Sequence, residues 1–208
     1  MSNLLQNQET KLDKPNNVKS IIFDIDDTCG DLKLRLRDIY RRATGDDTIC
    51  YTHWDDYGVK DRYGITSDQL STLFIEDQSL QLMKPHDGLV EVISSLKSDG
   101  YNIEFVTARG WHPDGYNVTQ KWLEDNQVYY DRINIVPLHQ CKEEATRHIE
   151  NIVLFVDDRH DHCLNMVKSG RVQKSLLFTQ PWNKHLPVSE KLVPITTLYD
   201  VLEHLPEN

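Results

Sequence analysis

Short apolar runs rich in branched residues recur along the chain, and between them lie segments whose apolar residues repeat with a helical period. Runs that are apolar at nearly every position are typical of strands buried on both faces of a parallel sheet. We therefore predict strands at residues 18–25, 101–107, 133–137, 151–158 and 174–179.

The segments between these runs predict helices, because their apolar residues fall on one face. The predicted helices are 87–98, 115–126, 141–149 and 160–169. Strands that alternate with helices form right-handed βαβ units. The predicted fold class is α/β, a Rossmann-like doubly wound parallel sheet, and the site of such a sheet lies at the carboxyl ends of its strands.

One connection is too long for a simple crossover. About 75 residues separate the first predicted strand from Tyr101, and they contain helix-like pieces at 31–44 and 67–81. We predict a small helical cap at 31–83, inserted after the first strand, with a core made of 18–30 and 84–208. The polar residues 1–17 are expected to form a flexible N-terminal segment.

Composition narrows the class of protein. The chain has 208 residues, of which 38% are hydrophobic, and no apolar stretch approaches the length of a membrane span. With no secretory signal pattern in the first residues, we expect a cytoplasmic protein that makes no membrane contact. The four cysteines, which form no CxxC pair, are expected to be free thiols. A net charge of -10 makes a nucleic-acid partner unlikely.

Chemically active residues follow or precede several of the predicted strands. If the strand ends meet at one edge of the sheet, carboxylates, a lysine, an arginine and a hydroxyl come together, which suits a hard cation and a phosphate. Each residue alone has a simpler explanation, as a turn former, a helix cap or a solvated charge. The residues are Asp24 and Asp26, Thr107 and Arg109, Lys142, and Asp157 and Asp158.

Four motifs in order along the chain resemble the haloacid dehalogenase-like (HAD) superfamily of aspartate-nucleophile phosphatases. FDIDDT is similar to its DxDxT motif, FVTAR to its second motif, CKEEA to its lysine motif and LFVDDRHD to its acidic fourth motif. The resemblance covers residues 18 to 180. Within the superfamily, the chain resembles the 5'(3')-deoxyribonucleotidases and, in part, the polynucleotide 3'-phosphatases; its DIDDT form also looks like the class B acid phosphatases, which are secreted.

The resemblance implies roles for the acidic residues. Asp24 would be the nucleophile and Asp26 the general acid and base. Mg²⁺ would be held by Asp24, the main-chain carbonyl of Asp26, and Asp157, with Asp158 completing the set. The fourth motif can also be interpreted as acids four residues apart, which leaves Asp161 as an alternative to Asp158.

The resemblance also implies roles for the other polar residues of the motifs. Thr107, Arg109 and Lys142 would bind the substrate phosphate. Asp27 and Asp31 are interpreted as loop or helix-capping residues, because Asp is favoured at such positions.

Three further polar residues lie within or beside the motifs. Thr28 is expected to steady the loop. His160 and His162 flank Asp161, but an oxygen-rich site favours Mg²⁺ over a transition metal.

Aromatic residues offer two interpretations. They could stack on a nucleobase, or they could form the small core of the cap and pack in loops. The residues concerned are Trp54, Tyr57, Tyr63 and Phe74 in the cap, and Trp111 and Trp182 in loops after strands.

We therefore expect a Mg²⁺-dependent phosphatase that acts through an aspartyl-phosphate on a small phosphate ester, a nucleoside monophosphate above all. The alternatives are a polynucleotide 3'-phosphatase, which would require a basic groove, and a non-catalytic HAD-like phosphate-binding protein. A signalling receiver module is disfavoured because the order of its acids and its lysine differs. The sequence leaves open whether the chain forms a homodimer.

Overall fold

Six parallel strands form a single sheet in the order β3-β2-β1-β4-β5-β6. The structure is a computed structural model that describes residues 18–56, 58–138 and 140–207, so the predicted N-terminal segment 1–17 lies outside the described residues. The strands are β1 (Ser20–Phe23), β2 (Asn102–Thr107), β3 (Arg132–Ile135), β4 (Ile152–Asp157), β5 (Val172–Phe178) and β6 (Leu192–Ile195). The prediction of a doubly wound α/β sheet is confirmed.

The sixth strand, β6, is absent from the sequence prediction. It is short and contains Pro194, which pairs with Leu177 of β5 in the register of the sheet. Proline cannot donate a hydrogen bond to a strand ladder, so it is found on edge strands and argues against a strand when the sequence is considered alone. Because β6 is the outermost strand of the sheet, it can contain this proline.

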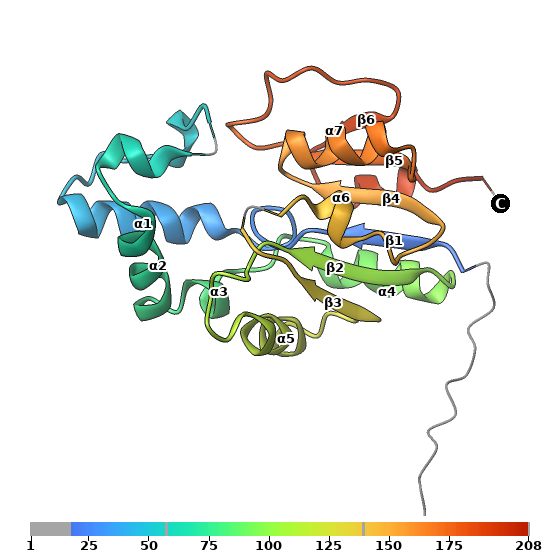
Figure 1. Cartoon of the computed structure of the whole chain (residues 1–208), viewed down its shortest axis with the longest axis horizontal. Helices are drawn as coiled ribbons and strands as arrows, with labels where there is room; N and C mark the ends of the chain where they lie inside the picture. The colour runs from blue at the N-terminus through green and yellow to red at the C-terminus, as the bar shows by residue number, and fades with distance from the viewer. Residues whose placement is uncertain (1–17, 57, 139, 208) are drawn as a thin grey trace, which may run out of the picture.

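Helices cover both faces of the sheet, and the alternation of side chains along β1 follows from this arrangement. Ile21 and Phe23 pack into the apolar cluster beneath α4 (Leu89–Ser98) and α5 (Gly115–Asp125). Ile22 packs into the cluster on the other face, beneath α7 (His160–Ser169). Figure 1 shows α4 and α5 on one side of the sheet and α6 and α7 on the other.

Two helices of the core differ from the sequence prediction: one is shorter than predicted, and the other was not predicted. The helix predicted at 141–149 is limited to α6 (Lys142–Ala145). The hydroxyl of Thr146 donates to the carbonyl oxygen of Lys142 at 2.9 Å, which is typical of a residue that competes with the helical backbone. A final short helix, α8 (Asp200–Glu203), packs Val201 into the cluster beneath α4.

The segment between β1 and α4 is helical, as predicted, and lies beyond the strand ends at the left of Figure 1. It contains α1 (Leu32–Thr44), two 3₁₀ turns (Tyr51–His53 and Val59–Tyr63), α2 (Ser67–Glu76) and α3 (Ser79–Leu82). Tyr40, Ile49, Trp54, Val59 and Ile65 form its own buried cluster, which Trp182 of the core completes. The exact boundaries of the cap at 31 and 83 stay a prediction.

The single helix predicted at 67–81 is divided into α2 and α3. Gln78, between them, has a left-handed backbone with φ of 51°. The neighbouring Asp77 accepts hydrogen bonds from Arg35 and Arg42 of α1 and, at 2.8 Å, from the hydroxyl of Ser79. These bonds to another helix stabilise a bend that the local apolar pattern does not reveal.

A glycine at the start of α5 sets how closely that helix approaches the loop after β2. A Cβ added to Gly115 would lie 2.5 Å from the carbonyl oxygen of Arg109, a backbone atom. A side chain at this position would therefore push α5 away from the loop that carries Arg109.

We expect Gly115→Ala to lower the free energy of unfolding by about 1–3 kcal/mol, the usual cost of overpacking. Gly58→Ala is the matched control, because a Cβ there would meet only Asp56 Oδ1 at 3.7 Å. Chemical denaturation of both variants measures the difference. Equal stabilities of the two variants would contradict the close approach.

Candidate active site

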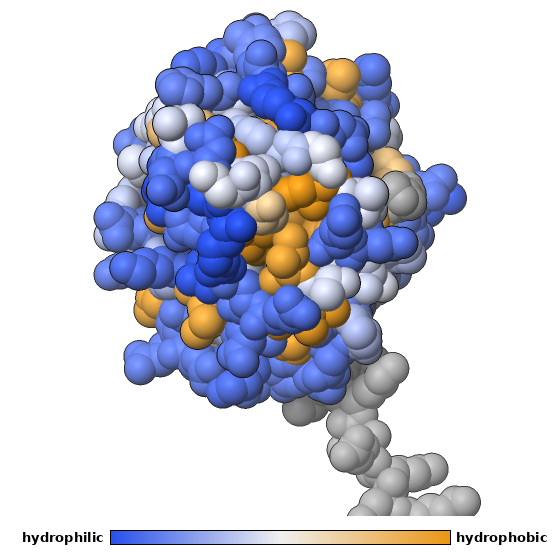
Figure 2. Space-filling view, turned by 90° about the vertical axis from the view of Figure 1, so that its left-hand side faces the viewer, coloured by the Kyte–Doolittle hydropathy of each residue, from blue (hydrophilic) through white to orange (hydrophobic). Residues whose placement is uncertain are grey.

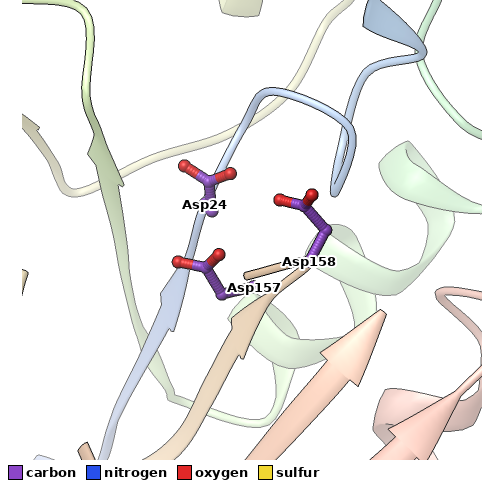
Figure 3. A group of neighbouring side chains, drawn as sticks. All are labelled: Asp24, Asp157 and Asp158. Atoms are coloured by element: carbon purple, nitrogen blue, oxygen red, sulfur yellow. The ribbon is translucent and has the colours of Figure 1, made fainter. Parts of the chain in front are cut away.

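Parallel register brings two aspartates of distant sequence side by side. Phe23 of β1 is paired with Val156 of β4, and the backbone N–H of Asp24 donates to the carbonyl oxygen of Val156 at 2.8 Å. Asp24 and Asp157 therefore leave the sheet at the same level. Figure 3 shows the carboxylates of Asp24, Asp157 and Asp158 turned into one space at the ends of β1 and β4. One oxygen from each lies within 4.8 Å of the others.

Lys142 neutralises part of this negative charge. Its side chain is 2% exposed, and its ammonium group donates to Asp24 Oδ1 and, at 2.8 Å, to Asp157 Oδ2. Burial alone would lower the pKa of Lys142, but the two carboxylates hold it above its usual range. Lys142 lies at the start of the helix predicted at 141–149, and it is the first residue of α6.

The two paired aspartates differ in acidity. Burial raises the pKa of Asp24 to about 6, although Lys142 acts against the shift. Burial also acts to raise the pKa of Asp157, but Lys142 and His162 outweigh it and hold that pKa below its usual range. The ring of His162 lies 3.1 Å from Asp157 Oδ2, and the backbone N–H of Arg159 donates to Asp157 Oδ1 at 2.8 Å. Asp157 thus remains an anion, while the charge on Asp24 depends on its surroundings.

Asp158 is held by uncharged donors. Trp182 Nε1 donates to Asp158 Oδ2 at 3.0 Å, and the backbone N–H of Asp158 donates to the Thr28 hydroxyl at 2.9 Å. The same hydroxyl lies 3.4 Å from both Asp24 Oδ2 and Asp158 Oδ1. Burial, followed by the charges of Asp157 and Asp24, raises the pKa of Asp158 well above its ordinary value. A cation bound between the carboxylates would offset this burial and repulsion and so favour the ionised form of Asp158.

The three carboxylates fit the cation that the motifs imply. Hard oxygen ligands at close range suit Mg²⁺, which binds to proteins through few carboxylates and otherwise through water and phosphate. Asp161, the alternative to Asp158, is not in this group, because it pairs with Arg159 at 2.6 Å and its side chain is 58% exposed. His160 Nε2 lies 2.7 Å from the carbonyl oxygen of Pro187, whereas the ring of His162 contacts Asp157, so the two histidines have different partners.

Asp26 and Arg109 form a second pair beside this group. Arg109 Nη2 donates to Asp26 Oδ1 at 2.6 Å, and Nε donates to Oδ2 at 3.0 Å. The Thr107 hydroxyl lies 3.4 Å from Asp26 Oδ2. Arg109 is wholly buried, whereas the side chain of Asp26 is 17% exposed. The predicted acid and base is therefore held by the arginine that the motifs assign to phosphate, and that phosphate contact stays a prediction.

Asp27 is a loop residue that contacts the start of α1, as interpreted from the sequence. Its φ is 60°, a left-handed conformation that Gly adopts without strain and Asp tolerates. Asp27 Oδ1 accepts from the backbone N–H of Lys33, in the first turn of α1, at 2.6 Å. Asp31 accepts from the Lys33 ammonium at 2.7 Å and makes no side-chain cap to α1.

The sequence missed most of the residues that support the carboxylates. Thr28 is more than a loop residue, because it bridges Asp24 and Asp158. Asn183 Nδ2 donates to the carbonyl oxygen of Asp158 at 2.7 Å, and Gln180 Nε2 donates to that of Asp27 at 2.7 Å. A signal was present in the run FTQPWN, but nothing local connects residues 180–183 to motifs more than 20 residues away.

A cavity of about 250 Å³ lies between the carboxylates and the cap. Asp24, Asp26 and Lys142 line its floor, and its walls are mainly apolar, with Leu36, Leu70 and other residues from the cap. Figure 2 views the end of the molecule that carries the cap and shows hydrophobic side chains gathered in a hollow at the centre of that face.

Some of the aromatic residues singled out from the sequence line the cavity, and others belong to the packing of the cap. Phe74, Trp111 and Trp182 line the cavity. Trp54 also lines it, yet it is 3% exposed and packs against Trp182 with ring centroids 6.4 Å apart. Tyr63 accepts from Trp54 Nε1 at 3.1 Å and belongs to the packing of the cap. Tyr57 lies outside the described residues.

Comparison with solved structures supports the fold that the motifs predict. The chain has a TM-score of 0.62 and 15% identity to a predicted phosphatase from Clostridium acetobutylicum, over 89% of this chain and 99% of that one. A HAD-superfamily hydrolase from Geobacter sulfurreducens has a TM-score of 0.57 and 14% identity, over 91% and 97% of the two chains. CbbY from Rhodobacter sphaeroides, in complex with phosphate, has a TM-score of 0.61 and 12% identity over 91% and 99%. The chain therefore has the fold of these solved structures, one of which is a HAD-superfamily hydrolase.

Comparison by sequence finds a relative whose name gives a more specific activity. No family model matches the chain. It is 25% identical over 113 residues to "Putative nucleotidase YqfW" of Bacillus subtilis (strain 168). The match covers 54% of this chain and 55% of that protein, so the chain spans about half the length of the relative it matches. Among the described residues, none of the helices has both the length and the apolar character that a bilayer span requires.

We expect Mg²⁺ to raise the melting temperature of the protein, and Asp158→Asn to remove most of this effect, because Asp158 belongs to the carboxylate group. At ten times its dissociation constant, a bound ion adds about 1.4 kcal/mol, which is worth several degrees in a chain of this size. Asp161→Asn is the control and should respond to Mg²⁺ like the unmodified protein. Loss of the response in Asp161→Asn alone would instead assign the fourth ligand position to Asp161.

We also expect Asp27, which lines the cavity, to make the stability of the folded protein depend on pH. Burial, opposed by Lys33, raises its pKa to about 8. The folded state therefore keeps a proton that the unfolded state releases between pH 4 and 8, and stability falls across this window by up to about 1.4 kcal/mol per pH unit. Asp27→Asn lacks this proton, so its stability relative to the unmodified protein should rise from pH 5 to pH 8. Metal-free denaturation curves that stay parallel across this range would contradict the buried acid.

Proposed function

We propose that this protein is a Mg²⁺-dependent phosphatase that hydrolyses nucleoside monophosphates through an aspartyl-phosphate intermediate. The observation that carries the proposal is the group of three buried carboxylates with a buried lysine at the ends of β1 and β4. Such a group is costly unless it binds a cation and an anion together, and a phosphate ester with Mg²⁺ supplies both.

In this proposal Asp24 is the nucleophile. A phosphate monoester resists attack because its own negative charge repels nucleophiles, so the reaction is divided into two easier displacements. The Asp24 carboxylate forms a bond to phosphorus as the bond between phosphorus and the ester oxygen breaks. Because the pKa of Asp24 is raised only to about 6, Asp24 remains an anion at neutral pH, as a nucleophile must.

Asp26 is the general acid and base of the proposed reaction. It gives a proton to the ester oxygen as the alcohol leaves. It then takes a proton from the water that attacks phosphorus and releases inorganic phosphate from Asp24. Asp26 lines the same cavity as Asp24, and its side chain remains partly exposed to that cavity.

The other residues supply electrostatic stabilisation. Asp24, Asp157, Asp158 and the main-chain carbonyl of Asp26 would hold Mg²⁺, which when bound neutralises the charge of the phosphate oxygens. Lys142, which lines the cavity, offers its ammonium group to the phosphate and to Asp24. Thr107 and the backbone N–H groups that follow it are proposed to bind the remaining phosphate oxygens.

The choice of a nucleoside monophosphate rests on the cavity. Its mainly apolar walls contain aromatic rings, and a base has two apolar faces that stack on such rings. A polynucleotide would instead need a basic groove, and the chain has a net charge of -10. The nucleotidase name of the Bacillus subtilis relative agrees with this choice. Cytoplasmic location and homodimer formation stay predictions.

We expect the protein with Mg²⁺ to release phosphate from dUMP or dTMP at least about tenfold faster, in kcat/KM, than from a 3'-phosphorylated oligonucleotide. A phosphate-release assay that compares these substrates, with and without Mg²⁺, measures the preference. Preference for the oligonucleotide would favour the polynucleotide 3'-phosphatase.

Asp24→Asn is the control for the chemistry. It keeps the shape of the side chain and should fold, but it should lose turnover on every substrate, because an amide is a poor nucleophile. Retained turnover would refute the nucleophile assignment, and no turnover by the unmodified protein on any nucleotide or small phosphate ester would favour the non-catalytic phosphate-binding alternative.

A further inference from the structure

Arg109 is one of the largest wholly buried side chains of the protein, and its carboxylate partner is Asp26. Its guanidinium group contacts both oxygens of Asp26, through Nη2 at 2.6 Å and through Nε at 3.0 and 3.2 Å. This planar, two-pronged arrangement orients a carboxylate as well as binding it. Arg109 does not appear among the described residues that line the cavity, whereas Asp26 does.

The far side of the guanidinium group is anchored to α5. Arg109 Nη1 donates to the Thr119 hydroxyl at 3.0 Å, and that hydroxyl donates to the carbonyl oxygen of Gly115 at 2.7 Å. Thr119 is wholly buried, and Arg109 Nη2 also lies 3.7 Å from the sulfur of Met83. The arginine is therefore fixed on the side that faces away from Asp26.

The backbone around Arg109 is fixed as well. The N–H of Gly110 donates to the carbonyl oxygen of Val136 at 3.0 Å, and a Cβ on Gly110 would lie 2.8 Å from that same oxygen. Gly115 approaches the carbonyl oxygen of Arg109 in the same manner. The loop after β2 is thus packed closely against the start of α5 and against the segment after β3.

We propose that Arg109 is a positioning residue, which orients the Asp26 carboxylate towards the leaving group and makes no contact with the substrate phosphate. This inference rests on the proposed phosphatase function, in which Asp26 gives a proton to the departing alcohol. A carboxylate on a loop can rotate, and a fixed arginine that contacts both of its oxygens removes that freedom before the substrate binds.

The two roles of Arg109 differ in their dependence on the leaving group. A nucleoside leaves as an alkoxide that must be protonated, whereas p-nitrophenol leaves readily as an anion. Loss of a positioned acid therefore harms hydrolysis of dUMP far more than hydrolysis of p-nitrophenyl phosphate. Loss of a phosphate contact would harm both substrates equally, because both have the same phosphate group.

We expect Arg109→Lys to lower kcat/KM for dUMP by about 100-fold and for p-nitrophenyl phosphate by less than about tenfold, within the range that a general acid contributes. The inhibition constant of inorganic phosphate should stay within about twofold. Asp26→Asn should show the same selective loss, and the double variant should lose little more than either single variant, because the two residues act as one unit.

Thr119→Val tests the proposal without removing the buried arginine. It keeps the size of the side chain and removes the hydroxyl that anchors Nη1, so the same selective loss should appear at a smaller magnitude. Arg35→Lys is the matched control, because Arg35 also donates to an aspartate, Asp77, but in the cap and outside the cavity lining. It should leave the ratio of the two kcat/KM values unchanged.

The outcomes separate this inference from the proposed function. Equal losses on the two substrates, or a tenfold weaker inhibition by phosphate in Arg109→Lys, would overturn the positioning role and assign Arg109 to phosphate while leaving the phosphatase intact. An unmodified protein that hydrolyses neither substrate with Mg²⁺ would overturn the proposed function, and the positioning role with it. Circular dichroism and melting temperatures of each variant distinguish these results from loss of the fold.

Discussion

The pairing of Lys142 with Asp24 and Asp157 is the interaction on which the rest of the site depends. Parallel register places the two aspartates at neighbouring strand ends, and burial there removes the water that would otherwise separate their charges. Without a buried cation next to them, two such carboxylates would not both stay ionised. The lysine keeps the site assembled in an anionic form, and the net negative charge that remains is what favours a divalent cation.

Next to this charged group, Asp158 is bound by uncharged partners. Asp158 is held by the indole of Trp182 and by Thr28, which add no charge, so the acid remains able to accept a cation. Trp182 also packs against Trp54 of the cap. One side chain therefore contacts both a candidate metal ligand and the segment that walls the cavity, which links the position of the cap to the carboxylate group.

Where the observed elements differ from the predicted ones, the cause is a contact with a distant part of the chain. The strand that contains Pro194 is stabilised by its pairing with β5 at the edge of the sheet. The bend at Gln78 depends on Asp77, which binds two arginines of α1 that lie more than 30 residues earlier in the chain. Helix α6 ends at Ala145, and the hydroxyl of the next residue, Thr146, accepts a hydrogen bond from the guanidinium group of Arg171. In each case a long-range contact outweighs the local apolar pattern.

The sequence alone determined the class of sheet and the candidate residues at its carboxyl edge. The length and spacing of apolar runs are local properties, and three of the five runs lead directly into candidate site residues. It also separated Asp27 from the neighbouring acids, since a turn and a helix cap have local signals. Only the tertiary structure decided that Asp158 joins the carboxylate group while Asp161 pairs with Arg159, and that Arg109 contacts Asp26. These choices depend on directions and distances between residues of different elements, which a pattern along one chain does not contain.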